Sequence, residues 1–161
     1  MALRNIVTEG DPILRKNCRP VEAVDDRIRG ILEDMLETMR EAEGVGIAAP
    51  QVGIMRRMFI AEPAQGEVYY MVNPEILEES GSEEGEEGCL SVPGYSGIVK
   101  RPTYLKLEAL DFDGKKRIVE VHDFAARVMA HEYDHLNGVL YIDKAESIQE
   151  VNYDEEESGE A

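Results

Sequence analysis

The pattern of apolar positions predicts a first helix between Asp25 and Gly44. Apolar residues recur there at intervals of three and four positions: Ile28, Ile31, Leu32, Met35, Leu36 and Met39. This spacing gathers them into one stripe along a helix. Asp25 or Asp26 is placed to cap the start of the helix, and Gly44 to end it. We therefore expect a long amphipathic helix near the N-terminus, with methionines that fill the core.

The middle of the chain has the shorter period of β-strands. Runs rich in β-branched and aromatic residues are separated by glycine, proline or acidic breaks: "RMFIAE", "EVYYMVNPEI", "GIVKRP", "YLKLEALDF" and "KRIVEV". Between the last two runs, Asp113 and Gly114 are a strong signal for a hairpin turn. These runs predict antiparallel strands.

A second helix is predicted to begin after Asp123, its expected N-cap, and to stop at Asn137 and Gly138. Four residues share one face of it: Phe124, Val128, His131 and His135. Hairpin strands between two helices predict an α+β fold, with antiparallel sheets packed around the second helix, rather than a parallel doubly wound sheet. Residues 1–150 carry no internal repeat or linker, so we expect one domain.

Composition narrows the classes of function. The chain has 161 residues, of which 43% are hydrophobic, enough for one core. Its formal net charge of −17 argues against direct nucleic-acid binding, because such a surface repels phosphate groups. The acidic run at 78–87, "EESGSEEGEE", is expected to be a solvated, mobile loop, and residues 151–161 an acidic, disordered tail. A partner contact or loose cation binding is the alternative for both segments.

Cellular setting is indicated by what the sequence lacks. No apolar run reaches the eighteen residues of a membrane span, and the first residues lack the regions of a signal peptide. The two cysteines, Cys18 and Cys89, are too few for the disulfide framework of a small secreted domain. We expect a cytoplasmic protein in which Cys89 is free for chemistry.

The segment "HEYDH", residues 131–135, has the spacing of a metal site. His131 and His135 are about one helical turn, ~6 Å, apart, so both imidazoles project from one face. Glu132 sits roughly 100° around the helix, where it can reach a water on the metal. Two ordinary core or surface histidines are the alternative interpretation. The third histidine, His122, is assigned no role.

A catalytic metal needs a third protein ligand and one open position. The protease pattern H-E-x-x-H-x-x-G-x-x-H is matched through Gly138, but its last position holds Tyr141. A glutamate from a later helix has little room, because the chain after Gly138 is short and ends in the acidic tail. The remaining candidate is Cys89 in "EEGCLSVPG", whose alternative role is that of a buried structural thiol.

Together with the segment "GVGIAAPQ" at 44–51, the chain carries three motifs in succession. The other two are "EGCLS" at 87–91 and "HEYDH" at 131–135. With them, the chain resembles a peptide deformylase from about "DPILR" through "GVLYID". One of these motifs alone would be weak, since H-E-x-x-H is widespread, but the three together are highly specific.

The resemblance implies a role for each matching residue. The implied metal ligands are Cys89, His131 and His135. Glu132 would be the general acid/base, while the Gln51 side-chain amide and the Leu90 backbone N–H would hold the formyl oxygen. The native metal would be Fe²⁺, with Zn²⁺, Ni²⁺ or Co²⁺ able to occupy the same site. The implied reaction is hydrolytic removal of the formyl group from N-formylmethionine of new polypeptides, with release of formate.

The resemblance also implies how the substrate lies. A formylated nascent peptide would add a strand along Val45 and Gly46, with Gly88 and Leu90 opposite. A plain helix-to-strand turn is the alternative for the first segment. The methionine side chain would enter an apolar pocket, for which Phe124 and Val128 are candidate walls; a plain core role is the alternative for both.

Two departures from the family pattern bear on these expectations. Many members carry a glutamine directly before the first histidine, where this chain has Ala130, so the orientation of the site is open. Some members dock on the ribosome through a basic C-terminal helix. The tail here is acidic, so any ribosome contact should use another surface, and we expect a monomer.

Two other functions compete with the deformylase. A zinc endopeptidase of the H-E-x-x-H type would cleave internal peptide bonds, and it too would need Cys89 as its third ligand. A non-catalytic module would bind a metal and peptide N-termini without turnover. The presence of both Glu132 and Gln51 argues against that module, since binding alone would require neither an acid/base nor an oxyanion donor.

Overall fold

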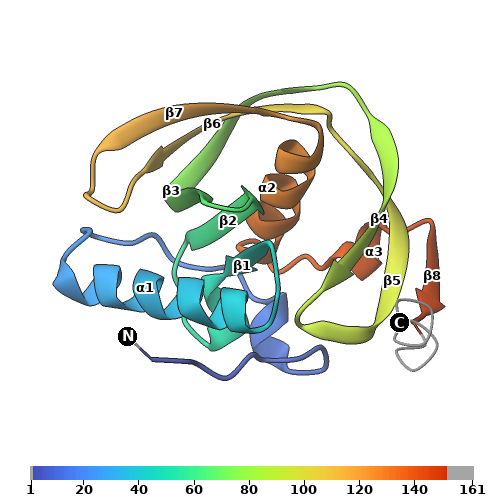
Figure 1. Ribbon diagram of the computed structural model, residues 1–161, viewed down its shortest axis with the longest axis horizontal. Coiled ribbons are helices and arrows are strands. Elements are labelled where there is room, and N and C mark those ends of the chain that lie inside the picture. The colour runs from blue at the N-terminus through green and yellow to red at the C-terminus, as the bar shows by residue number, and fades with distance from the viewer. Residues whose placement is uncertain (1, 152–161) are drawn as a thin grey trace.

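The structure, a computed structural model, describes residues 2–151. The predicted tail therefore lies outside the described residues except for Val151. The described chain has a mixed fold with antiparallel sheets and few helices (Figure 1). No helix within residues 2–151 combines the length and apolarity needed to cross a membrane.

The strands form two antiparallel sheets. The five-stranded sheet has the order β1 (Gly46–Ala48), β2 (Met58–Ala64), β3 (Glu67–Ser80), β6 (Tyr104–Leu110) and β7 (Lys116–His122). The three-stranded sheet has the order β4 (Glu83–Cys89), β5 (Val92–Arg101) and β8 (Ser147–Glu150). The helices are α1 (Asp26–Glu41), α2 (Asp123–His135) and α3 (Tyr141–Lys144), with 3-10 turns η1 (Pro12–Arg15) and η2 (Ala49–Val52).

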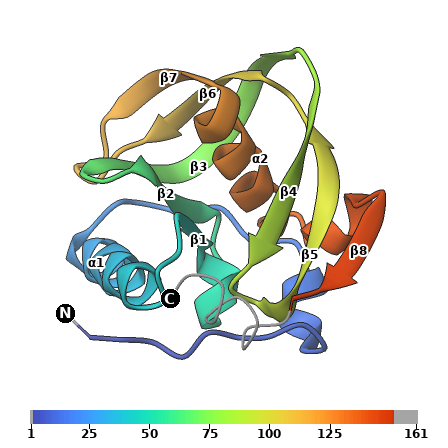
Figure 2. The same cartoon turned by 45° about the vertical axis from the view of Figure 1, so that its right-hand side comes forward.

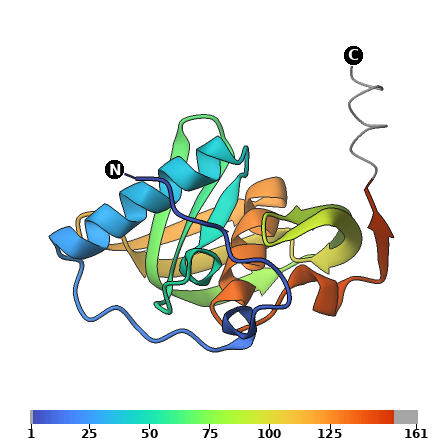
Figure 3. The ribbon, with the colours of Figure 1, turned by 90° about the horizontal axis from the view of Figure 1, so that it is seen from below.

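Helices cover both faces of the five-stranded sheet at β1 and β2. Along β2, Met58 and Ile60 join the apolar cluster of α1, while Phe59 and Ala61 join that of α2. This alternation follows from the two-residue period of a strand. Figure 2 shows α2 between the two sheets, and Figure 3 shows α3 and β8 on the side away from α1.

The first helix begins as the sequence indicates but ends earlier. The Asp25 carboxylate accepts a hydrogen bond of 3.0 Å from the Ile28 N–H, as expected of an N-cap. The last helical residue is Glu41, and Glu43 adopts a left-handed φ of 59°. Gly44 therefore does not end the helix, because a non-glycine residue two positions after Glu41 already turns the chain.

The start of α2 corrects a second expectation. Asp123 is its first residue rather than its N-cap, and it has a φ of 50°. His122 holds the N-cap position while it is still paired with Tyr104 across β6 and β7. The strand thus runs directly into the helix, which leaves no extended residue between them for a capping aspartate. The predicted stop is confirmed, because Gly138 takes a φ of 75° just after the helix.

The acidic run at 78–87 is not a loop, so that expectation is wrong. Its residues form the end of β3, a tight turn and most of β4. Glu78 lies opposite Lys106 in the β3–β6 pair, and Glu84 lies opposite Lys100 in the β4–β5 pair. These cross-strand pairs of opposite charge favour the strand where the composition alone indicated repulsion.

Candidate active site

A cavity of 340 Å³ opens between α2, β4 and the segment that follows α1. The predicted site residues that line it are Val45, Gly46, Gln51, Gly88, Cys89, Leu90, Phe124, Val128, His131 and Glu132. His135 does not line the cavity and is 1% exposed. The three sequence motifs therefore converge on one place, although they lie far apart along the chain.

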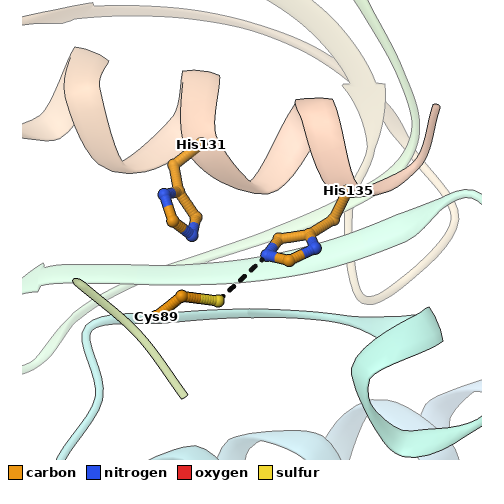
Figure 4. Close-up of side chains that lie close together, drawn as sticks. All are labelled: Cys89, His131 and His135. Carbon is orange, nitrogen blue, oxygen red and sulfur yellow. Dashed lines mark hydrogen bonds between the residues drawn. The ribbon is translucent and has the colours of Figure 1, made fainter. Parts of the chain in front are cut away.

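Cys89, His131 and His135 form one cluster of potential metal-binding atoms. Their ligand atoms all lie within 4.8 Å of one another. The two histidines come from successive turns of α2, and Cys89 is the last residue of β4. Figure 4 shows the thiol and the two rings directed toward one another. Cys89 Sγ lies 3.3 Å from His135 Nε2. One sulfur and two imidazole nitrogens suit a divalent transition metal.

Glu87 supports this cluster through its contact with His131. Its Oε1 lies 2.8 Å from His131 Nδ1 and accepts a 3.0 Å hydrogen bond from Arg101 Nη2. Its Oε2 accepts from Arg101 Nε at 2.8 Å and from Arg127 Nη1 at 2.7 Å. The four contacts use all the acceptor sites of one carboxylate. His131 is thereby oriented with Nε2 turned away from Glu87, toward the cluster.

Glu87 stays charged in this network because its cationic partners outweigh its burial. Burial acts to raise the pKa of Glu87, but hydrogen bonds from His131 and Arg101 and the Arg101 charge outweigh it and lower that pKa to about 2. Arg101 also donates to Asp134 at 2.7 Å, and Lys144 Nζ lies 3.0 Å from the same carboxylate oxygen. Glu87 is thus a fixed anion at neutral pH.

The two histidines differ in their affinity for protons. Burial opposes protonation of His131, but its hydrogen bond with Cys89 and the charge of Glu132 outweigh burial and raise its pKa to about 10. Burial and the charge of His131 lower the pKa of His135. Of the two histidines, His131 is therefore the one that holds a proton, and a metal cation would compete with that proton.

Glu132 lies beside the cluster without belonging to it. Its Oε2 is 4.0 Å from His131 Nε2, and its Oε1 is buried with no hydrogen-bond partner among residues 2–151. Burial raises the pKa of Glu132 to about 7. A Cβ at Gly46 would lie 2.6 Å from Glu132 Oε2, so the glycine lets the β1 backbone approach this carboxylate. A carboxyl with a pKa near neutrality can both accept and return a proton.

Gln51 has a fixed amide orientation. Its Oε1 accepts from the Ala48 N–H at 2.9 Å, and its Nε2 donates to Ser91 Oγ at 3.0 Å and lies 3.6 Å from Cys89 Sγ. The amide N–H groups therefore face the cluster. Leu90 begins the turn between β4 and β5 and packs on Gly44, where a Cβ would come within 2.8 Å of Leu90 Cδ1.

Phe124 and Val128 line the cavity in different ways. Phe124 is 53% exposed, so the plain core role considered for it is wrong. Val128 is buried and belongs to both the cavity wall and the apolar cluster of α2. Exposed Val45 and Tyr95 also line the cavity, which gives it an apolar rim.

Sequence reasoning missed four residues of the site. They support the cluster or Gln51, and they are Glu87, Ser91, Arg101 and Arg127. Glu87 and Ser91 flank the cysteine in "EGCLS", which is the one signal that could have singled them out. The two arginines come from β5 and α2 and carry no local signal.

Comparison with known proteins identifies the family. The sequence model of the polypeptide deformylase family matches residues 3–151. A peptide deformylase of Clostridium botulinum is 51% identical over 144 residues, which cover 89% of this chain and 97% of that protein. One of Agathobacter rectalis is 47% identical over 156 residues, covering 96% and 98%.

Solved structures give the same result. The crystal structure of a peptide deformylase from Thermotoga maritima matches with a TM-score of 0.88 and 41% identity, covering 91% of this chain and all of that one. A peptide deformylase from Synechococcus elongatus, solved in complex with actinonin, matches with a TM-score of 0.86 and 35% identity, covering 89% and 79%. These findings confirm the resemblance read from the three motifs, and the chain belongs to the polypeptide deformylase family of enzymes.

Proposed function

We propose that this chain removes the formyl group from the N-terminal formylmethionine of newly made polypeptides and releases formate. The observation that carries the proposal is the convergence of Cys89, His131 and His135, whose ligand atoms lie within 4.8 Å of one another beside the buried carboxylate of Glu132. Family membership supports the reaction, and the cavity supplies room for a peptide end.

The donor set fits one divalent metal ion. Cys89, His131 and His135 would hold it, and Fe²⁺ is the proposed native metal, with Zn²⁺, Ni²⁺ or Co²⁺ suited to the same donors. When bound, the metal supplies Lewis-acid chemistry, which makes water a better nucleophile and polarises the formyl carbonyl.

Glu132 is proposed to move the proton. Its carboxylate takes a proton from the attacking water and gives it to the departing methionine amine, a double role that suits a pKa near neutrality. The Gln51 Nε2–H and the Leu90 backbone N–H are proposed to stabilise the oxyanion. The bond from Ala48 N–H to Gln51 Oε1 supports this role, since it turns the donor end of the amide toward Cys89.

The peptide is proposed to lie between the open edges of β1 and β4. The Val45 carbonyl accepts a hydrogen bond from Glu62, so the alternation of an antiparallel strand directs the N–H and C=O of Gly46 to the open edge. On the other side, Gly88 falls in the register shift between Glu87 and Cys89 and has no described partner in β5. The methionine side chain would contact Phe124 and Val128.

The test combines metal content with formate release. The protein is purified without oxygen, because a thiolate–Fe²⁺ site is vulnerable to oxidation, and its metal is measured. Formate release from a formyl-Met tripeptide is then compared in the wild type, Glu132→Ala and Cys89→Ala. We expect one metal per chain in the wild type and in Glu132→Ala, and loss of turnover in Glu132→Ala. Cys89→Ala should weaken metal binding itself.

Other results would point elsewhere. Metal without formate release in the wild type would favour the binding module, and cleavage of an unformylated peptide at internal bonds would favour an endopeptidase. A Cys89→Ala variant with unchanged metal and activity would refute the proposed ligand set. The monomeric state, a ribosome contact away from a basic C-terminal helix and a cytoplasmic location remain predictions.

A further inference from the structure

The strand β4 has a sequence that disfavours a strand. Its seven residues, "EEGEEGC", include four glutamates and two glycines. Glutamate and glycine are both depleted in strands, and glycine leaves no side chain to pack. β4 is also at the edge of its three-stranded sheet, so only β5 pairs with it. Its position beside the cavity must therefore depend on contacts from outside the sheet.

Arg127 supplies such contacts from α2. Its Nη2 donates to the Glu83 carbonyl at 2.7 Å, and its Nη1 donates to the Val99 carbonyl at 3.0 Å and to Glu87 Oε2 at 2.7 Å. One guanidinium thus joins α2 to both ends of β4 and to the neighbouring strand. Figure 2 shows β4 running alongside α2. The Arg127 side chain is only 13% exposed.

Gly85 makes this arrangement possible. A Cβ at Gly85 would lie 2.8 Å from both Cζ and Nη2 of Arg127, so the guanidinium packs over the glycine. A side chain at position 85 and the arginine compete for the same space. The glycine that weakens β4 as a strand is therefore the residue that lets Arg127 hold it.

We propose that Arg127 is a positioning residue that fixes the open edge of β4 against α2 for binding of the formylated peptide. The inference rests on the proposed function, because Gly88 on this edge is a proposed peptide contact. Arg127 lines the cavity but would act through the β4 backbone, without touching the reacting atoms.

The metal cluster has a support that does not depend on Arg127. The positioning of β4 can therefore be tested separately from metal binding. Glu87 keeps three contacts without Arg127, two from Arg101 and one with His131. Arg101 also holds Asp134, the residue before the last one of α2. Loss of Arg127 should therefore release the Glu83 end of β4 and leave His131 in place.

The test is steady-state formate release combined with amide hydrogen exchange. For Arg127→Ala, we expect KM for a formyl-Met tripeptide to rise by about tenfold with kcat changed less than about threefold, because the loss concerns binding more than chemistry. Exchange at residues 83–88 should speed up by about tenfold, while metal content stays that of the wild type. The KM of Arg127→Lys should fall between those of the wild type and Arg127→Ala. A single ammonium nitrogen cannot reach all three acceptors that two guanidinium nitrogens contact.

Two further variants make the test specific. Gly85→Ala keeps the arginine but pushes its guanidinium off the strand, so it should raise KM in the same direction by a smaller factor. Arg117→Ala removes an arginine that is 60% exposed and pairs with Asp111, away from the cavity, and should change neither KM nor exchange in β4.

Two outcomes would overturn the inference. One is an Arg127→Ala variant with unchanged KM and unchanged exchange at residues 83–88. The other is a fall in kcat together with loss of metal, which would assign Arg127 to the metal cluster instead. Absence of formate release in the wild type would count against the proposed function, while the exchange data would still show whether Arg127 holds β4.

Discussion

Replacing Glu87 with glutamine should lower the free energy of unfolding by about 3 kcal/mol at neutral pH. The Glu87 side chain is 5% exposed, and the fold lowers its pKa from 4.5 to about 2. At about 1.4 kcal/mol for each pH unit, this difference corresponds to about 3 kcal/mol of stability. Breaking a buried ion pair by removing one partner commonly costs about 3–5 kcal/mol, which agrees.

The pH dependence gives the sign of the effect. A carboxyl whose pKa is lowered by folding stabilises the protein above its unfolded pKa, and that contribution disappears as the pH falls through the folded pKa. For Glu87 the contribution is complete above pH 4.5 and declines toward pH 2. The stability difference between wild type and Glu87→Gln should therefore be largest at pH 7 and shrink below pH 4.5.

Urea unfolding of the metal-free protein, followed by circular dichroism, measures this difference at pH 7 and pH 3. Glu86→Gln is the matched control, because Glu86 is exposed and adjacent, and it should change stability little. A loss below about 1 kcal/mol at pH 7, or an equal loss at both pH values, would refute the assignment of Glu87 as the charged centre of the network.

Three further predictions concern other parts of the molecule. Cys18 is buried and its pKa is raised to about 11 by burial, so a maleimide at pH 7 should modify Cys89 alone in the metal-free protein, as seen in the intact mass. Gly46→Ala would place a Cβ 2.6 Å from Glu132 Oε2, so formate release should fall by about 10² while metal content is kept. Gly138→Ala puts a side chain at a φ of 75°, 2.5 Å from a backbone oxygen at the end of η1; thermal unfolding should show a loss of at least about 1 kcal/mol.

The elements that sequence reasoning placed well are those with a strong local signal. The buried residues of α1 include Ile28, Met35 and Met39, which belong to the predicted stripe. The hairpin between β6 and β7 turns at Gly114, whose φ is 81°, as the Asp-Gly signal predicted. Period and turn chemistry are local properties, so the sequence is enough for them.

The acidic run at 78–87 shows where local reasoning fails. Its charge predicted repulsion and mobility, but the bases that lie opposite, among them Lys100 and Lys106, are distant in the sequence. Glu87 was missed for the same reason. Its partners Arg101 and Arg127 come from β5 and α2, so only the fold shows that this acid is buried and paired.

The orientation of His131 follows from the same network. The resemblance left this orientation open, because Ala130 stands directly before the histidine where many family members carry a glutamine. His131 is oriented by Glu87 on β4, while Ala130 packs in the apolar cluster of α2. Glu87, Gly88 and Cys89 are consecutive, so one short segment carries the support of a proposed metal ligand, a proposed peptide contact and a second proposed ligand. Arg101 bonds to Glu87 beside the metal cluster, while Arg127 joins the Glu83 end of β4 to α2. Loss of both arginines would therefore disturb peptide binding and the metal site together, whereas loss of Arg127 alone leaves Arg101 to hold Glu87 against His131.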